Sequence, residues 1–331
     1  MFLTARVLFL NEEDYIWYVL KSMYDAVDAI VIVEGCIGEY GRIEGFYSKS
    51  GLSIDRSSEE IERFIANDDP DGKVWNYKYG FAKNYAELAN HAVDLFPRET
   101  THFLNVDADE CYKALDILRV RQMFSDHPRL CGVAVDRIHF YLDFWTRRIS
   151  KKMGKLEPTG GTMFRKFYPG EYYPEKSAEH NPYFEGEPLI NWWLPWIAQD
   201  DIETGIKDAQ EQGLDGITLR KRVIPQYHYG WVRKREKMIE RVLQTYRRSD
   251  AYSGLNVRAE SSDQELTEFI ETYNPIWTGI LPDEDVLQKF PPSKVNRIRC
   301  DQILWEAVGE HPLPMKDHPF FGMQRRDFGW L

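Results

Sequence analysis

Thr101-His102-Phe103-Leu104-Asn105-Val106-Asp107-Ala108-Asp109-Glu110 is a short apolar run that ends in two carboxylates separated by one small residue. In an extended segment, side chains two positions apart point to the same side. Asp107 and Asp109 are therefore predicted to face one ligand from the end of a strand. Mg²⁺ and Mn²⁺ prefer carboxylate oxygen and are often shared between the protein and substrate phosphates. The stretch predicts a metal site that holds a diphosphate.

The D-x-D pattern alone is a weak signal, because the chain contains it twice more. Asp69-Pro70-Asp71 and Asp283-Glu284-Asp285 lie in polar surroundings with proline and are interpreted as solvated turns. Asp107-Ala108-Asp109 differs because a predicted buried strand precedes it. The alternative to metal binding at this position is an N-cap for the following helix.

Strand and helix patterns alternate through the first 110 residues. Strands are predicted over 5–10, 29–34 and 73–77 and in the run that ends at Asp107, with helices after Asn11, from Ser57, over 82–96 and over 114–124. Asn11 with Asp14, and Ser57-Ser58-Glu59-Glu60, fit capping boxes. The alternation predicts an α/β fold with a mainly parallel sheet, whose ligands bind beyond the carboxyl ends of the strands. Asn11, Glu34 and Asp107 all fall at such predicted ends.

The second part of the chain is less regular. It is predicted to contain a strand over 130–140, an aromatic-rich loop region over about 141–200, a final edge strand over 223–228 and a basic helix over 233–248. His228 ends the last strand, and both a structural role and a ligand role stay open for it. The start of the basic helix, Arg233-Lys234-Arg235, is either a solvated face or a group that neutralises a diphosphate.

Composition limits the classes of partner. A formal net charge of −11 argues against a surface that grips a nucleic-acid backbone. The four cysteines are far apart and form no CxxC pair, which argues against structural zinc and disulfides and favours a reducing compartment. Arg6 interrupts the N-terminal apolar run, and no stretch is long enough to span a membrane. We therefore expect a cytoplasmic protein. P-loop and G-x-G-x-x-G motifs are missing, which argues against a P-loop kinase or a Rossmann dehydrogenase.

Several segments together resemble family 2 glycosyltransferases. They are Val7-Leu8-Phe9-Leu10-Asn11-Glu12-Glu13-Asp14, Ile30-Val31-Ile32-Val33-Glu34, Ser53-Ile54-Asp55-Arg56-Ser57, Lys83-Asn84 and Asn105-Val106-Asp107-Ala108-Asp109-Glu110. The resemblance is good over residues 3–112, although the second strand usually ends in Asp in this family. Further on, Met163-Phe164-Arg165-Lys166-Phe167, Ala178-Glu179-His180 and Gln226-Tyr227-His228-Tyr229-Gly230 resemble one branch of these enzymes, which has His-Glu where this chain has Glu-His.

The resemblance implies a Rossmann-like GT-A fold and a metal-dependent, inverting transferase. Its donor would be a nucleotide-diphosphate sugar, with UDP as the first choice, and its acceptor a hydroxyl of a glycan or small molecule. It implies that Mn²⁺ or Mg²⁺ is bound by Asp107, Asp109 and His228, and that Asn11, Glu34, Lys83 and Asp107 place the nucleotide. The catalytic base would be Glu179, Asp200 or Asp201, which we leave unranked, because the last two could equally cap a helix at Ile202.

The predicted organisation is a catalytic domain over 1–232, with a nucleotide-sugar half (1–112) and an acceptor-side half (113–232), and a C-terminal helical extension over 233–331 packed on it. Three alternatives are kept. They are a nucleotidyltransferase, which the acidic turn after the first strand disfavours, a non-catalytic sugar- or nucleotide-binding module, and a transferase that acts on modified nucleic-acid bases.

Overall fold

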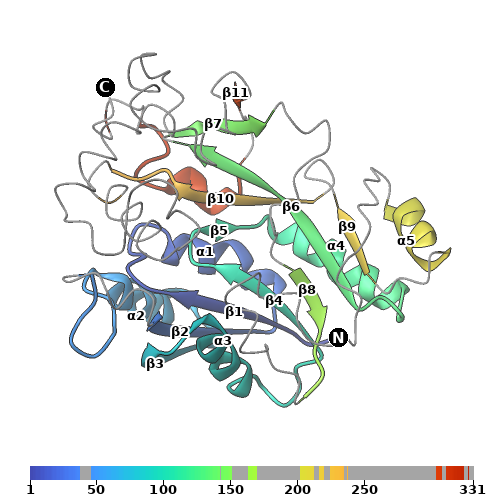
Figure 1. Ribbon diagram of the computed structural model, residues 1–331, viewed down its shortest axis with the longest axis horizontal. Coiled ribbons are helices and arrows are strands. Elements are labelled where there is room, and N and C mark those ends of the chain that lie inside the picture. Colours follow the sequence, from blue (N-terminus) through green and yellow to red (C-terminus); the bar gives the residue numbers. More distant parts are fainter. Residues whose placement is uncertain are drawn as a thin grey trace, which may run out of the picture.

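Four parallel strands form the centre of the first half of the molecule (Figure 1). They are β1 (Leu3–Phe9), β2 (Ala29–Ile37), β3 (Val74–Ala82) and β4 (His102–Asp107), and their order in the sheet is β3-β2-β1-β4. This computed structural model describes residues 1–37, 46–141, 143–150, 163–169, 202–211, 216–219, 224–234, 237, 303–307, 311–323 and 327. The predicted α/β class with a mainly parallel sheet is confirmed.

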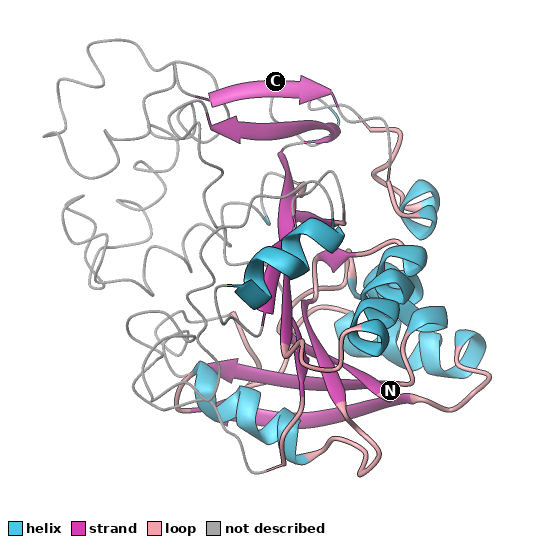
Figure 2. Cartoon of the chain, turned by 90° about the vertical axis from the view of Figure 1, so that its right-hand side faces the viewer, coloured by secondary structure: helices cyan, strands magenta, loops and turns pink. Residues whose placement is uncertain are grey.

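Helices cover both faces of this sheet. The helices are α1 (Ile16–Met23), α2 (Ser57–Asp68), α3 (Tyr85–Asp94) and α4 (Ala114–Asp126), and η1 (Tyr24–Ala26) is a 3₁₀ turn after α1. Alternate β1 residues such as Leu3 and Val7 share one core with α1, α2 and α4. Val31 and Val33 of β2 face the other way and pack on α3. In Figure 2 most helices accordingly lie on one side of the strands.

We call β5 and the described residues from 132 onward the second half of the molecule, and it adds strands beyond β4. They are β5 (Glu110–Cys111), β6 (Gly132–Tyr141), β7 (Asp143–Ser150), β8 (Met163–Lys166), β9 (Gly216–Leu219), β10 (Pro225–Trp231) and β11 (Ile303–Ala307), together with α5 (Ile202–Glu211) and the 3₁₀ helix η7 (Leu313–Asp317). Antiparallel β8 lies between β4 and β6, and β10 runs parallel to β6. The short β5 pairs with β10 and therefore joins the end of β4 to the second half.

Several local predictions are wrong. Helix α1 begins at Ile16, and Asn11 adopts a left-handed backbone (φ 58°) instead of capping it. Helix α2 begins one residue earlier than a Ser57 cap implies. Strand β10 is not the last strand, because β11 follows, and it is flanked by β6 and β5 over part of its length. The base candidates Glu179, Asp200 and Asp201, and most of the predicted 233–248 helix, lie outside the described residues.

The segment 311–323 returns to the first half. Met315 in η7 is fully buried in the core that contains α1. The hydroxyl of Tyr229 in β10 is 2.9 Å from His311 Nδ1, and His318 Nε2 is 2.7 Å from the carbonyl oxygen of Asp14. The segment therefore holds the β1–α1 turn against β10. Within the described part of the chain, no helix combines the length and apolar character needed to cross a membrane.

Candidate functional site

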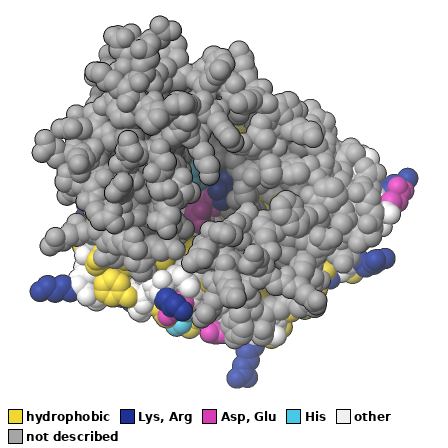
Figure 3. All heavy atoms as spheres, viewed as in Figure 1, with side chains coloured by type: hydrophobic (Ala, Val, Ile, Leu, Met, Phe, Trp, Pro, Cys, Tyr) yellow, Lys and Arg dark blue, Asp and Glu magenta, His cyan; other side chains and the backbone are white. Residues whose placement is uncertain are grey.

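The carboxyl ends of β1 and β4 meet at the point where the strand order of the sheet reverses. The chain proceeds from β1 outward to β2 and β3 on one side and returns to β4 on the other. Leu8, near the end of β1, is in register with Asp107, the last residue of β4. Open α/β sheets bind ligands at such a switch point. Near the centre of Figure 3, acidic, basic and histidine side chains are visible.

Asp107 and Asp109 lie in different environments. Strand β4 ends at Asp107, and residues 108–109 form a turn, so the prediction of one extended segment with both carboxylates on the same side is wrong. The side chain of Asp107 is 58% exposed, whereas that of Asp109 is only 2% exposed. The two carboxylates therefore lie at different depths below the surface.

Pairing of β5 with β10 brings His228 to Asp109. His228 is in register with Glu110, and the Tyr229 backbone N–H donates to the Asp109 carbonyl oxygen at 2.9 Å. His228 Nε2 lies 3.5 Å from Asp109 Oδ1. Two atoms at this separation can both contact a cation whose bonds are about 2.0–2.1 Å long. The predicted ligand role of His228 is therefore geometrically possible.

Carboxylate and imidazole donors suit Mn²⁺ and Mg²⁺. Among the residues that the structure describes, no group of three or more His, Cys, Asp or Glu side chains is arranged to hold a metal ion. Mg²⁺-type sites commonly use one or two carboxylates and complete their coordination with substrate phosphates and water. Asp109 and His228, with Asp107 nearby in sequence, fit this incomplete type of site and do not form a self-sufficient cage.

A buried network supports the Asp107 side of the site. The Glu110 side chain is fully buried, and its Oε2 accepts from the Asp107 backbone N–H at 2.9 Å and from Gln226 Nε2 at 2.7 Å. Its Oε1 lies 2.6 Å from Arg137 of β6. Arg137 also donates from Nε to Gln226 Oε1 at 2.6 Å, and its NH2 group is 3.8 Å from Asp107 Oδ2. Sequence reasoning missed Glu110, Arg137 and Gln226, since only the strand pairing brings them together.

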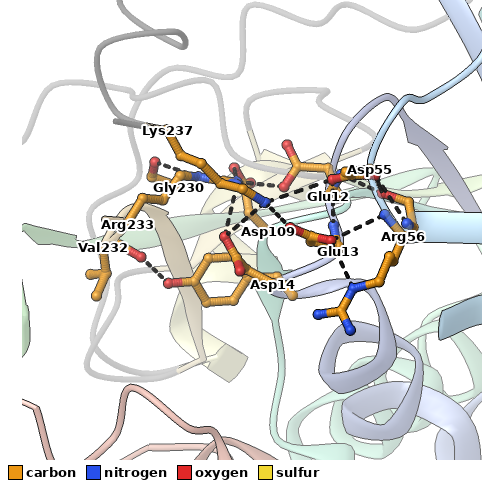
Figure 4. A network of polar contacts seen from close by, with 12 residues as sticks. Glu12, Glu13, Asp14, Asp55, Arg56, Asp109, Gly230, Val232, Arg233 and Lys237 are labelled. Carbon is orange, nitrogen blue, oxygen red and sulfur yellow. Dashed lines mark hydrogen bonds and ion pairs between the residues drawn. The ribbon is translucent and has the colours of Figure 1, made fainter. Parts of the chain in front are cut away.

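A second network supports the Asp109 side (Figure 4). Arg233 follows β10, is 3% exposed, and pairs with Glu12 in the turn after β1. Its NH2 group is also 3.5 Å from Asp109 Oδ2. Burial alone would lower the pKa of the guanidinium, but Glu12 and Asp109 raise it above its ordinary value. Arg233 thus stays charged and balances buried carboxylates from two segments.

Lys237 extends this network outward. It pairs with Glu13 and is 3.6 Å from Asp14 Oδ2 and 3.8 Å from Asp55 Oδ2. The pKa of Lys237 is raised by these carboxylates against the opposing effect of burial. An acidic run, Asn11-Glu12-Glu13-Asp14, and a basic run that begins at Arg233 are visible in the sequence, but their pairing is not. In the basic run itself, Arg233 is paired with carboxylates, Lys234 is exposed, and Arg235 lies outside the described residues. The solvated role therefore does not apply to Arg233, and neutralisation of a diphosphate stays a prediction.

Asn11 and Glu34 are both bound to the loop before α2. Asn11 Oδ1 accepts from the Ile54 N–H at 2.9 Å, and the Asn11 N–H donates to Ser53 Oγ at 3.0 Å. Glu34 is fully buried and accepts from the Ser53 N–H at 2.7 Å and from Ser58 Oγ at 3.0 Å. These two residues therefore shape one loop beside the site.

Lys83 lies apart from the other predicted site residues. It is exposed and follows β3, which is separated from β1 by β2. Its backbone N–H donates to Glu87 Oε2 at 2.7 Å, in a reciprocal cap with Asn84, which accepts from the Glu87 N–H. The structure thus gathers Asp107, Asp109 and His228 at one place, sets Asn11 and Glu34 beside them, and leaves Lys83 at the outer strand.

No protein-family model matches the chain, and no curated protein sequence matches it. Several solved structures are similar to it at low identity. TarS 1-349 from S. aureus in complex with UDP is 12% identical, with a TM-score of 0.41 over 82% of this chain and 72% of that one. The mannosyltransferase PcManGT from Pyrobaculum calidifontis in complex with GDP-Man and Mn²⁺ is 14% identical, with a TM-score of 0.42 over 74% and 61%. Glucosyl-3-phosphoglycerate synthase from Mycobacterium tuberculosis, in complex with Mn²⁺, UDP and glucosyl-3-phosphoglycerate, is 12% identical, with a TM-score of 0.38 over 77% and 82%.

Proposed function

We propose that the protein is a metal-dependent glycosyltransferase that moves a sugar from a nucleotide-diphosphate donor, with UDP as the first choice, to an acceptor hydroxyl. The observation that carries the proposal is the meeting of His228 Nε2 and Asp109 Oδ1, 3.5 Å apart, at the switch point of the sheet. This is the place where an α/β sheet binds nucleotides. The resemblance of the β1, β2 and β4 segments to family 2 glycosyltransferases supports the same reaction.

Asp109 and His228 would hold Mn²⁺ or Mg²⁺. The exposed carboxylate of Asp107 would have to turn toward the cation to become a third ligand. A cation bound there would offset the charge that develops on the departing diphosphate. The contact with Arg233 keeps the Asp109 carboxylate in place. A carboxylate that is already fixed does not need to reorganise when the ligand binds. The loop 53–58, held by Asn11 and Glu34, would place the nucleotide.

Inversion at the anomeric carbon requires one direct displacement by the acceptor oxygen. The acceptor proton must pass to a base on the side opposite the leaving diphosphate. Glu179, Asp200 and Asp201 remain the candidates for this base. Lys83 remains a candidate contact for the nucleotide, from the outer side of the sheet.

The experiment combines binding with turnover. Thermal shift is measured with UDP-glucose, UDP-N-acetylglucosamine and GDP-mannose, each with and without Mn²⁺, and release of the nucleoside diphosphate is followed for each donor. We expect one donor to raise the melting temperature only with Mn²⁺, and slow hydrolysis of that donor without acceptor. Asp109→Asn should remove both effects, because it replaces a carboxylate ligand with an amide of the same shape.

A matched control comes from a second D-x-D pattern. Asp71 lies in the turn before β3, is 65% exposed, and pairs with Lys73 at 3.6 Å. Asp71→Asn should leave both the thermal shift and the turnover at the wild-type level. Metal-dependent turnover that survives Asp109→Asn would overturn the proposed metal site, and binding without turnover of any donor would favour a non-catalytic binding module.

A further inference from the structure

Arg137 lies beside Asp107 and is oriented by buried groups. Its side chain is 17% exposed, and it comes from β6, which pairs with β10. Glu110 and Gln226 fix the guanidinium through contacts of 2.6 Å each, and both of these residues are fully buried. A guanidinium held in this way has a fixed orientation.

The contact between Arg137 and Asp107 is weak by comparison. The NH2 group is 3.8 Å from Asp107 Oδ2, and the Asp107 side chain is 58% exposed. Ion pairs of this exposed kind contribute little, since water screens them and the side chains lose freedom. A ligand can therefore replace this contact at little cost, whereas the contacts with Glu110 and Gln226 persist.

The other cations of the site are placed differently. Arg233 is 3% exposed and is surrounded by Glu12, Asp14 and Asp109. Lys237 contacts Glu13, Asp14 and Asp55 on the side of the acidic turn. Arg137 alone among these three lies next to the exposed carboxylate of the site. An exposed carboxylate beside an oriented arginine matches a cation-bound anion, because the cation takes the carboxylate and the arginine takes anion oxygens.

We infer that Arg137 is an anion-binding residue of this site and that it contacts the diphosphate of a metal–diphosphate ligand. The inference deepens the proposed function and rests on it only for the identity of the ligand as a sugar donor. Glu110 and Gln226 act as positioning residues that orient the guanidinium. Arg137 would stabilise the diphosphate both in the bound donor and as the leaving group.

The test separates anion binding from nucleoside binding. Calorimetric titrations of the full chain use inorganic pyrophosphate with Mn²⁺, UDP with Mn²⁺, and uridine. Arg137→Gln should weaken pyrophosphate and UDP binding by about tenfold or more, as expected for loss of a charged hydrogen bond. Uridine binding should stay at the wild-type level. The pyrophosphate and UDP affinities of Arg137→Lys should lie between those of the wild type and Arg137→Gln, because lysine keeps the charge and loses the paired donors.

Arg137→Gln leaves Glu110 buried without its cation, so a second variant protects the test against a folding defect. Arg137→Gln with Glu110→Gln removes both charges together, and far-UV circular dichroism checks the fold. Loss of a nearby negative charge would by itself strengthen anion binding. Weaker pyrophosphate binding in the double variant must therefore come from the loss of Arg137.

Arg121→Gln is the matched control. Arg121 is 23% exposed and pairs with Asp28, which precedes β2 at the opposite end of the sheet, so pyrophosphate binding should not change. Wild-type binding of pyrophosphate by both Arg137 variants, an equal loss of uridine binding, or no pyrophosphate binding by the wild type would each overturn the inference. If pyrophosphate binding depends on Arg137 but no donor is ever turned over, the anion site stands and the proposed transferase reaction fails.

Discussion

The two halves of the molecule bring opposite charges to the site. The half built on β1–β4 contributes the carboxylates Glu12, Glu13, Asp14, Asp107 and Asp109. The half built on β6 and β10 contributes Arg137, His228, Arg233 and Lys237. Neither set is electrically balanced alone, and several members are buried. The difference indicates that the charge pairs of the site form only when the two halves meet.

Arg233 gives the most severe test of this dependence. Arg233→Leu should lower the free energy of unfolding by about 3–5 kcal/mol, because it leaves the buried Asp109 and the partly buried Glu12 without their cation. Urea unfolding followed by circular dichroism measures the change. Arg56→Ala is the control within one half, since the Arg56 side chain is 71% exposed in its contact with Glu13 and should cost less than about 1 kcal/mol. Equal losses of unfolding free energy in the two variants would contradict the inference that charge pairs between the halves stabilise the fold more than an exposed pair within one half.

The next largest effect concerns the two aspartates. Asp109 contacts groups from the second half on both of its oxygens, whereas Asp107 is mostly exposed. Changes to residues behind a metal ligand typically cost 10–100-fold in metal affinity. We therefore expect more than about 100-fold weaker Mn²⁺ binding, in the presence of UDP, for Asp109→Asn, and about tenfold for Asp107→Asn. Electron paramagnetic resonance of free Mn²⁺ measures both, and a reversed order would remove the distinction between the two carboxylates.

The same division explains what could be predicted from the sequence. Strands β1, β2 and β4 and helix α3 follow from apolar periodicity and local turn residues, and Asp107 and Asp109 were found because a buried strand precedes them. Arg137 and Glu110 are 27 residues apart and carry no local pattern, so only the pairing of β5, β6 and β10 brings them together. Asn11 was misread as a helix cap because its competing partners, Ser53 and Ile54, come from a distant loop.

Buried histidines give a pH-dependent effect of intermediate size. Burial lowers the pKa of His102 in β4 to about 4, and it does the same for His311 and His318, which hold the C-terminal segment. The unfolded chain takes up protons below about pH 6.5 and the folded chain only near pH 4, so stability should fall as the pH drops through this window.

One histidine can be tested alone. His102→Gln should reduce the loss of unfolding free energy between pH 7 and pH 5 by about 1–2 kcal/mol, because one lowered pKa is removed. Urea midpoints at several pH values measure it. Asn67→Ala, which removes no titratable group, is the control and should keep the wild-type pH dependence. An unchanged slope in His102→Gln would show that this histidine is not buried in its neutral form.

The smallest expected effect is a local one within the first half. Asn84 caps α3 by accepting from the Glu87 N–H at 2.9 Å, and Asn84→Ala should lower the free energy of unfolding by about 1 kcal/mol. Asn67 lies near the C-terminal end of α2 and donates to the Arg63 carbonyl oxygen from an exposed position. Asn67→Ala should change the free energy of unfolding by less than about 0.5 kcal/mol. Among the described residues, neither asparagine side chain hydrogen-bonds to the second half, so both variants should retain wild-type Mn²⁺ and UDP affinity. A loss of affinity in Asn84→Ala would show that α3 is coupled to the site, and the separation into local and cross-half contacts would then have to be abandoned.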